Sequence, residues 1–195
     1  MQSIPTVTVT GKAAHAGMEP EKGVNAILAA SKAISALRLG RLDENTTANV
    51  GVINGGMIRN GIPDKTTFLA ECRSLIHEKA ENLSKEMVEI IEKEVMSIGA
   101  KVKIKVNNLC KAVDIPENSE TVEISKKALK SVGIDAKTTF ITGFTDASIY
   151  NNQGIEVAVV GIGAQLEHST EEHIYIADME KALKMVVEIL RLSAE

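Results

Sequence analysis

The sequence lacks the features that several common protein classes require. It contains only two cysteines, Cys72 and Cys110, without the paired spacing of a zinc site or a disulfide framework. We therefore expect reduced thiols and a cytoplasmic location. No apolar run is long enough to cross a bilayer, and Met1 is not followed by the charged and apolar segments of an export signal. The sequence thus predicts no membrane partner.

Positive charge is also scarce, with 22 basic residues against 26 acidic ones. A mildly acidic chain lacks the broad basic surface that nucleic-acid binding needs, so small or neutral partners fit better. The sequence has no His-Glu-x-x-His motif, no Gly-x-Ser-x-Gly motif and no phosphate-binding P-loop. No local cluster supplies the three protein ligands that a catalytic zinc ion needs.

Residues 1–108 carry the periodicities of four strands and two helices. Alternating apolar residues predict strands, and apolar residues that recur every three or four positions predict helices. The strands are expected at residues 6–10, 46–53, 66–73 and 101–106, and the helices at 24–37 and 77–96. The second and third strands are expected to pair as a hairpin. This βαββαβ order is that of the ferredoxin-like fold, an α+β arrangement with two helices on one face of an antiparallel sheet.

A linker that contains Pro116 is expected at about residues 107–118, and the rest of residues 109–195 follows a different rhythm. Helices and short apolar strands alternate here, which predicts a partial α/β layer. The run Val157–Val160 is typical of a strand buried on both faces. The expected strands lie at residues 138–141 and 157–160, and the helices at 122–132, 147–150 and 179–192, the last with Leu183, Val186, Val187 and Leu190 inward. So few strands leave the layer incomplete.

Four histidines and one aspartate are candidate functional residues. His15 lies in GKAAHAG between a strand and a helix, where a structural role and a catalytic role both remain open. His168 lies in GIGAQLEHSTEEH, directly after the apolar strand, where α/β sheets place ligands. Asp146 precedes a helix, as a cap or as an active-site carboxylate. His77 and His173 lie in charged contexts typical of a surface.

Several stretches together resemble one family of enzymes. GKAAHAGMEPEKGVNAI, TTANVGVINGGMIRNGIPD and AECRS resemble the lid, or dimerisation, domain of the di-zinc peptidases that include peptidase T (tripeptide aminopeptidase) and carboxypeptidase G. TGFTDASIYNNQGIEVAVVGIGAQLEHSTEEHIYI resembles the last part of their catalytic domain. The resemblance covers nearly all 195 residues in the family's order. It implies a lid domain at 1–108 and a C-terminal catalytic segment at 109–195.

The resemblance also implies roles for individual residues. His15 matches the lid histidine that reaches the partner subunit's active site in the family dimer and polarises the scissile carbonyl. Asn60 and Arg73 match lid positions that contact the far end of the substrate. Gly143 and Asp146 match a substrate-binding loop, in which the usual Gly-Gly-Ser/Thr-Asp is Gly-Phe-Thr-Asp here. A homodimer that forms through the lid is therefore expected.

His168 matches the C-terminal zinc ligand of the family. The intact enzymes hold two zinc ions, and their other metal ligands precede the lid, so His168 is the one candidate ligand in this sequence. The resemblance thus implies the C-terminal portion of a short-peptide hydrolase, inactive by itself. Two alternatives stay open: an interaction module whose role is dimerisation, and an N-acyl amino acid amidohydrolase or carboxypeptidase of the same superfamily.

Overall fold

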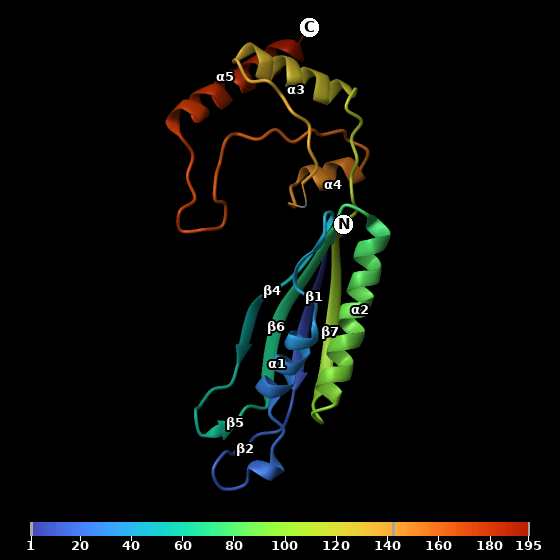
Figure 1. Ribbon diagram of the computed structural model, residues 1–195, viewed down its shortest axis with the longest axis vertical. Helices are drawn as coiled ribbons and strands as arrows, with labels where there is room; N and C mark the ends of the chain where they lie inside the picture. Colours follow the sequence, from blue (N-terminus) through green and yellow to red (C-terminus); the bar gives the residue numbers. More distant parts are fainter. Residues whose placement is uncertain (1, 142, 195) are drawn as a thin grey trace. The chain divides into compact units, whose positions relative to one another are not determined.

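The computed structural model describes residues 2–141 and 143–194. The chain divides into two compact units (Figure 1). The first comprises residues 1–112 together with 141–144, and the second comprises residues 113–140 and 145–195. Each unit is described here by itself. Among the described residues, no helix combines the length and the apolar character that a bilayer span requires.

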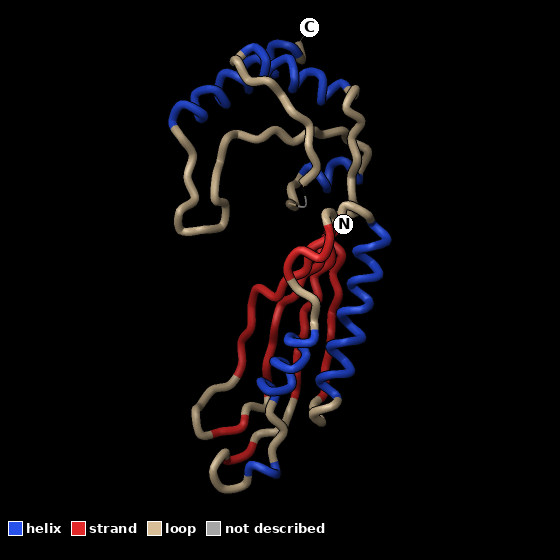
Figure 2. The backbone as a smooth tube through the Cα atoms, in the orientation of Figure 1, coloured by secondary structure: helices blue, strands red, loops and turns tan. Residues whose placement is uncertain are grey.

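The first unit is built on a five-stranded antiparallel sheet in the order β3-β4-β6-β1-β7, so the expectation of four strands is wrong by the short edge strand β3. Figure 2 shows the long strands side by side. The strands are β1 (Gln2–Thr10), β3 (Gly40–Asp43), β4 (Thr46–Gly55), β6 (Lys65–Ser74) and β7 (Lys101–Cys110). The expected hairpin of β4 and β6 is confirmed by their antiparallel register. β7 runs to Cys110, so residues 107–110, expected in a linker, are still part of the sheet.

Two helices, α1 (Ala26–Ala36) and α2 (His77–Met96), pack against each other and against one face of this sheet (Figure 1). The sequence predicts α2 with the same bounds, because its apolar residues repeat at helical spacing and Gly99 follows with a φ of 80°. The buried core includes Val7, Val9, Ala30, Ala33, Phe68, Cys72, Met87, Ile91 and Val95.

Helix α1 buries alanines rather than its large apolar residues. Asn25 caps it, because the Asn25 Oδ1 atom accepts a hydrogen bond from the Leu28 amide at 2.9 Å. The buried positions are Ala26, Ala29, Ala30 and Ala33. Ile27 and Leu28 are instead 37% and 55% exposed. Small side chains let the helix approach the sheet closely, and this leaves two large apolar side chains outside the core.

Two short strands form a separate two-stranded sheet at one end of the first unit. β2 (Ala14–His15) pairs with β5 (Gly61–Ile62) in antiparallel register. A 3-10 turn, η1 (Pro20–Lys22), follows β2. We call residues 11–24 and 58–64 the tip. The chain enters it from the ends of β1 and β4 and leaves it into α1 and β6 (Figure 1).

The second unit contains α3 (Glu120–Ser131), α4 (Ala147–Asn152) and α5 (Ile176–Leu192). The strands expected at 138–141 and 157–160 are extended segments outside any sheet, so this prediction is wrong for the part of the chain described. The Asn151 amide group satisfies the Val157 main chain instead, with bonds of 2.9 and 3.1 Å. A strand needs a neighbour to complete its ladder, and these segments have none among the described residues.

The apolar face of α5 is exposed, contrary to the expectation from the sequence. Only Met185 is buried, by packing near α3. Leu183, Val187 and Leu190 are 67%, 59% and 67% exposed. Periodicity placed these residues on one face correctly, but it does not show what covers that face. The described residues of this unit provide no sheet surface for it.

Candidate functional site

His15 and Asn60 are brought together in the tip. His15 pairs with Gly61 across the β2–β5 ladder. The amide nitrogen of Ala16 donates a hydrogen bond to the carbonyl oxygen of Asn60 at 3.0 Å. Both His15 and Asn60 are exposed. Two residues 45 positions apart in the sequence therefore lie in one accessible constellation.

Close backbone contacts hold this constellation in place. Lys12 and Val24 exchange two main-chain hydrogen bonds of 2.9 Å. A Cβ atom on Gly11 would lie 2.0 Å from the Val24 carbonyl oxygen, and one on Gly23 would lie 2.7 Å from Ile62 Cδ1. Only glycine fits these two positions without displacement of a neighbour. Gly11 and Gly23 thus allow the segment that follows β1 to pass close to the segment that leads back into α1.

The His15 ring is held by its own turn. The Nδ1 atom accepts hydrogen bonds from the amide of Gly17 at 3.2 Å and from the amide of Met18 at 3.1 Å. The His15 carbonyl oxygen accepts from the Glu19 amide at 3.1 Å. Residues 15–19 therefore form a compact turn around the imidazole, and the ring's orientation is set by local main-chain groups.

Arg73 lies at the opposite end of the sheet from the tip. It follows Lys65, the first residue of β6, by eight positions, which at roughly 3.3 Å per residue corresponds to about 26 Å. One guanidinium nitrogen of Arg73 lies 2.9 Å from a carboxylate oxygen of Glu71. That same carboxylate oxygen accepts a bond from the Gln2 side chain at 2.9 Å. Within one chain, Arg73 is therefore far from His15 and Asn60.

His168 lies in an exposed loop of the second unit. Its φ of 65° is left-handed, which is uncommon for a residue other than glycine. The His168 amide donates a hydrogen bond to the Glu172 carboxylate at 3.1 Å. The loop closes through main-chain bonds between Gln165 and His173 of 2.9 and 3.2 Å. Backbone strain of this kind often accompanies functional loops.

Gly143 and Asp146 are both exposed. Asp146 precedes α4 with helical dihedral angles, and its side chain makes no capping hydrogen bond. The interpretation of Asp146 as a helix cap is therefore wrong, whereas its carboxylate is accessible. A Cβ atom on Gly143 would contact Ile141 Cδ1 at an ordinary 3.6 Å, so the space around Gly143 does not require glycine.

The described residues do not assemble a metal centre by themselves. Nowhere in residues 2–141 and 143–194 do three or more histidine, cysteine, aspartate or glutamate side chains gather as metal ligands would. His168 is a suitable donor type, but one imidazole does not satisfy the coordination that zinc requires. The zinc expectation therefore does not fit the donor set of this chain alone.

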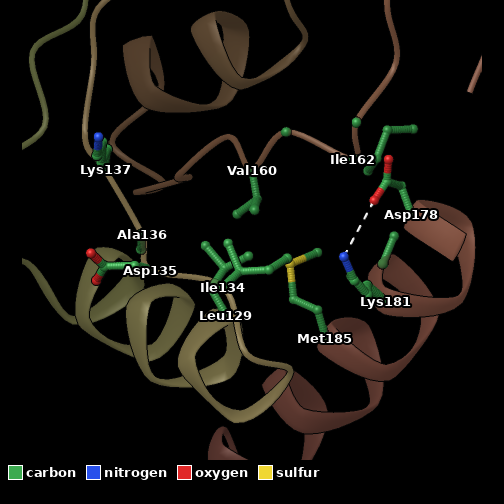
Figure 3. Close-up of a pocket in the computed structure, with 13 residues that line it drawn as sticks. Leu129, Ile134, Asp135, Ala136, Lys137, Val160, Ile162, Asp178, Lys181 and Met185 are labelled. Carbon is green, nitrogen blue, oxygen red and sulfur yellow. Dashed lines mark ion pairs between the residues drawn. The ribbon is translucent and has the colours of Figure 1, made fainter. Parts of the chain in front are cut away.

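A cavity of about 350 Å³ lies between α3, α5 and the segments 134–137 and 160–163 of the second unit (Figure 3). Its walls include Leu129, Val160 and Met185, and the ion pair between Asp178 and Lys181, at 3.6 Å, lies at its edge. None of the candidate catalytic or binding residues lines it.

Two supporting contacts were not predicted from the sequence. One is the pair of amides, from Gly17 and Met18, that bond to His15 Nδ1. The other is the Glu172 carboxylate that bonds to the His168 main chain. Main-chain donors leave no mark in residue identities, so the first had no signal. For the second, the only sign was an acidic residue four positions after a histidine.

Comparison with known proteins defines the class. Residues 6–98 match the family described as the peptidase dimerisation domain, and residues 90–192 match peptidase family M20/M25/M40. The chain thus combines a unit that matches a peptidase dimerisation domain with a following unit that matches a peptidase family. The chain belongs to peptidase family M20/M25/M40.

The matches to relatives cover 96% or more of this chain. It is 36% identical to YqjE of Bacillus subtilis over 96% of its length and 27% identical to peptidase T of Fusobacterium nucleatum, also over 96%. The crystal structure of aminopeptidase PepT from Bacillus cereus is 34% identical, with a TM-score of 0.78 over 100% of this chain and 52% of that one. A tripeptidase from Staphylococcus aureus is 33% identical, with a TM-score of 0.84 over 99% of this chain and 52% of that one. The chain spans 50% of YqjE and 46% of the Fusobacterium peptidase T, about half the length of these curated relatives.

Proposed function

We propose that this chain supplies the lid and the C-terminal catalytic segment of a cytoplasmic hydrolase that removes the N-terminal residue of short peptides. The family membership supports an amide-bond hydrolase, and the likeness to a tripeptidase and to peptidase T supports tripeptides as the substrate class. Residues 1–108 act as the ferredoxin-like lid and residues 109–195 as the catalytic segment. Because the chain spans about half of these relatives, we expect it to be inactive by itself.

The observation that carries the proposal is the separation of the substrate-binding residues. An extended tripeptide is about 10 Å long. His15 and Asn60 share the tip, whereas Arg73 lies about 26 Å away along β6. One chain cannot place all three residues on one short peptide. Two chains can, if the tip of one subunit enters the site to which the partner contributes Arg73.

Each of these residues has a chemical role that suits its position. His15 donates a hydrogen bond to the scissile carbonyl oxygen and stabilises the negative charge that develops there. Asn60, beside it, offers an amide for a second polar contact with the substrate. Arg73 binds the peptide carboxylate with its planar guanidinium fork. Gly143 and Asp146 contribute a loop that lines the substrate from the catalytic segment.

His168 is proposed as one metal ligand of the assembled enzyme. Two zinc ions would supply an activated water for amide hydrolysis when bound. The fold relatives extend well beyond the matched half, and the further ligands are expected in that other half. The left-handed backbone of His168 and the bond from its amide to Glu172 would hold the main chain from which the imidazole projects.

The dimer is proposed to form at the outer edge of β4. β3 pairs with Thr46, Thr47 and Ala48 only, so residues 49–55, NVGVING, have no strand on that side in the described structure. This stretch carries no charge, whereas the opposite edge strand, β7, carries three exposed lysines. Charged residues protect strand edges from pairing, and an unprotected edge invites a partner. Ile27 extends the apolar surface beside Gly55 and Gly56.

The test joins this chain to the complementary half of the Bacillus cereus aminopeptidase PepT and assays the purified, metal-loaded chimera. We expect hydrolysis of tripeptides, with a loss of about 10²–10³-fold in kcat for His15→Ala, as for other oxyanion donors. The unfused chain serves as the inactive control. Tripeptide hydrolysis by the unfused chain would contradict its inactivity.

The same chimera distinguishes the proposed peptidase from the two alternatives, an N-acyl amino acid amidohydrolase and a dimerisation module. A folded chimera that cleaves N-acyl amino acids and not tripeptides replaces the proposed substrate with that of an amidohydrolase. A folded, dimeric, metal-loaded chimera with neither activity supports the chain as a dimerisation module alone. Circular dichroism and sedimentation establish folding and dimerisation in each case.

A further inference from the structure

The two hydrogen bonds at His15 Nδ1 determine which ring nitrogen carries the proton. A main-chain N–H group can only donate, so the Gly17 and Met18 amides, at 3.2 and 3.1 Å, need a lone pair on Nδ1. In a neutral imidazole one nitrogen is a donor and the other an acceptor. With Nδ1 as the acceptor, the proton of the neutral ring lies on Nε2.

We infer that the main-chain amides of Gly17 and Met18 are positioning groups that fix His15 in the Nε2–H tautomer. The inference rests on the proposed function, in which His15 meets a carbonyl oxygen. A carbonyl oxygen needs a donor, and the opposite tautomer would present a lone pair at Nε2 and repel it. The turn thus selects the form of the ring that can stabilise the developing oxyanion.

The turn that supplies these donors is closed at both ends. The Met18 amide lies within 3.3 Å of the His15 carbonyl oxygen as well, and the Glu19 amide donates to that oxygen at 3.1 Å. At its other end, the Ala16 amide is bonded to the Asn60 carbonyl oxygen at 3.0 Å. The two amides that point at Nδ1 are therefore held by a network that also contains Asn60, and the ring does not depend on a side-chain partner.

His173 provides an internal reference with the opposite tautomer. Its Nδ1 atom lies 2.8 Å from the carbonyl oxygen of Glu171. A carbonyl oxygen can only accept, so His173 Nδ1 must carry the proton. One molecule therefore holds two exposed histidines in opposite neutral forms, each set by the main chain within three residues. A general property of exposed histidines cannot produce this contrast.

The test is a long-range proton–nitrogen NMR correlation on the ¹⁵N-labelled 195-residue chain at mildly alkaline pH. We expect the Nε2–H pattern for His15 and the Nδ1–H pattern for His173 in one spectrum. A scalar coupling across the hydrogen bond between the Met18 amide and His15 Nδ1 identifies the donor directly in the unmodified chain. A proton on His15 Nδ1, or averaged shifts of two interconverting tautomers, overturns the inference.

Two variants at Met18 distinguish the effect of its main-chain amide on the His15 tautomer from the effect of its side chain. Met18→Pro removes the N–H donor, and we expect the Nδ1–H fraction of His15 to rise severalfold while His173 is unchanged. Met18→Ala keeps the donor, and because the Met18 side chain is 76% exposed, we expect no change. If Met18→Pro leaves the His15 pattern unchanged, the Met18 amide has no positioning role. If this variant does not fold, the coupling in the unmodified chain decides.

The outcome is distinguishable from failure of the proposed function. A fixed Nε2–H ring in a folded chimera that cleaves no peptide refutes the function and leaves the tautomer assignment intact. Mixed tautomers in a chimera that hydrolyses tripeptides refute the assignment and leave the function intact.

Discussion

The carbonyl oxygen of Asn60 accepts a hydrogen bond from the amide of Ala16, the residue next to His15, at 3.0 Å. This contact joins two motifs that the sequence separates by the whole of α1 and β4. It makes the histidine and the asparagine one accessible constellation at the end of the sheet. Both residues are therefore far from Arg73, because the tip and Arg73 lie at opposite ends of β6.

We expect position 11, where the chain passes close to Val24, to tolerate no side chain. Gly11→Ala places a Cβ atom 2.0 Å from the Val24 carbonyl oxygen and disrupts the Lys12–Val24 bonds. We expect a loss of about 1–3 kcal/mol in the free energy of unfolding, measured by urea denaturation. Gly17→Ala is the matched control, because its nearest contact is an ordinary 3.7 Å from His15 Cε1. Equal stability of the two variants would show that the tip relaxes freely.

The proposed dimer edge can be tested with one charge. Ile27 is 37% exposed and lies beside Gly55 of β4, and Ile27→Glu should convert the dimer to a monomer in sedimentation at micromolar concentration. Val106 is 41% exposed on β7, at the opposite edge of the sheet, so Val106→Glu is the control and should remain dimeric. A monomer for the second variant and a dimer for the first would move the interface to β7.

A site shared between subunits predicts complementation between impaired variants. The His15→Ala and Arg73→Ala chimeras should each lose most of their activity alone. When equal amounts are unfolded, mixed and refolded, half of the dimers are mixed, and each mixed dimer carries one intact site. About a quarter of the unmodified activity should therefore return, as measured by tripeptide hydrolysis. No recovery in mixtures shown to contain mixed dimers would place both residues in the same subunit's site.

Cys72 should make the protein sensitive to alkali. Burial in the core raises the pKa of the Cys72 thiol from about 9 to about 11, mainly because the thiolate loses its hydration. Between these values the unfolded chain loses this proton and the folded chain keeps it, so stability falls as pH rises from about 9 to about 11. Urea unfolding across this range should show a shallower decline for Cys72→Ala.

The same burial predicts selective thiol chemistry. Cys72 is fully buried, whereas Cys110 is partly exposed at the end of β7. Iodoacetamide at neutral pH should modify Cys110 and leave Cys72 intact until the chain unfolds, because alkylation needs an accessible thiolate. Peptide mass mapping distinguishes the two sites. Rapid modification of both would show that β6 opens readily.

The sequence alone determined both helices and four strands of the first unit, β1, β4, β6 and β7, but not β3 or the short strands β2 and β5. The alternation of β1 and the apolar spacing of α2 are signals contained in a few neighbouring residues, and each corresponds to the element observed. The order of these elements, and the resemblance that assigned the family, followed from the same local information. The turn around His15 is local too, but its donors are main-chain amides that leave no mark in the residue types, so the sequence did not predict it.

Tertiary structure alone decided what covers each apolar face and which distant residues meet. The sequence identified one face of α5 but not its exposure, because burial depends on a second surface that periodicity does not encode. It predicted a strand at residues 157–160, but a strand forms only beside a neighbour that shares its ladder, and Asn151 bonds to Val157 instead. The proximity of His15 to Asn60, and their distance from Arg73, arise from strand pairing across long loops, an interaction that is set in space rather than along the chain.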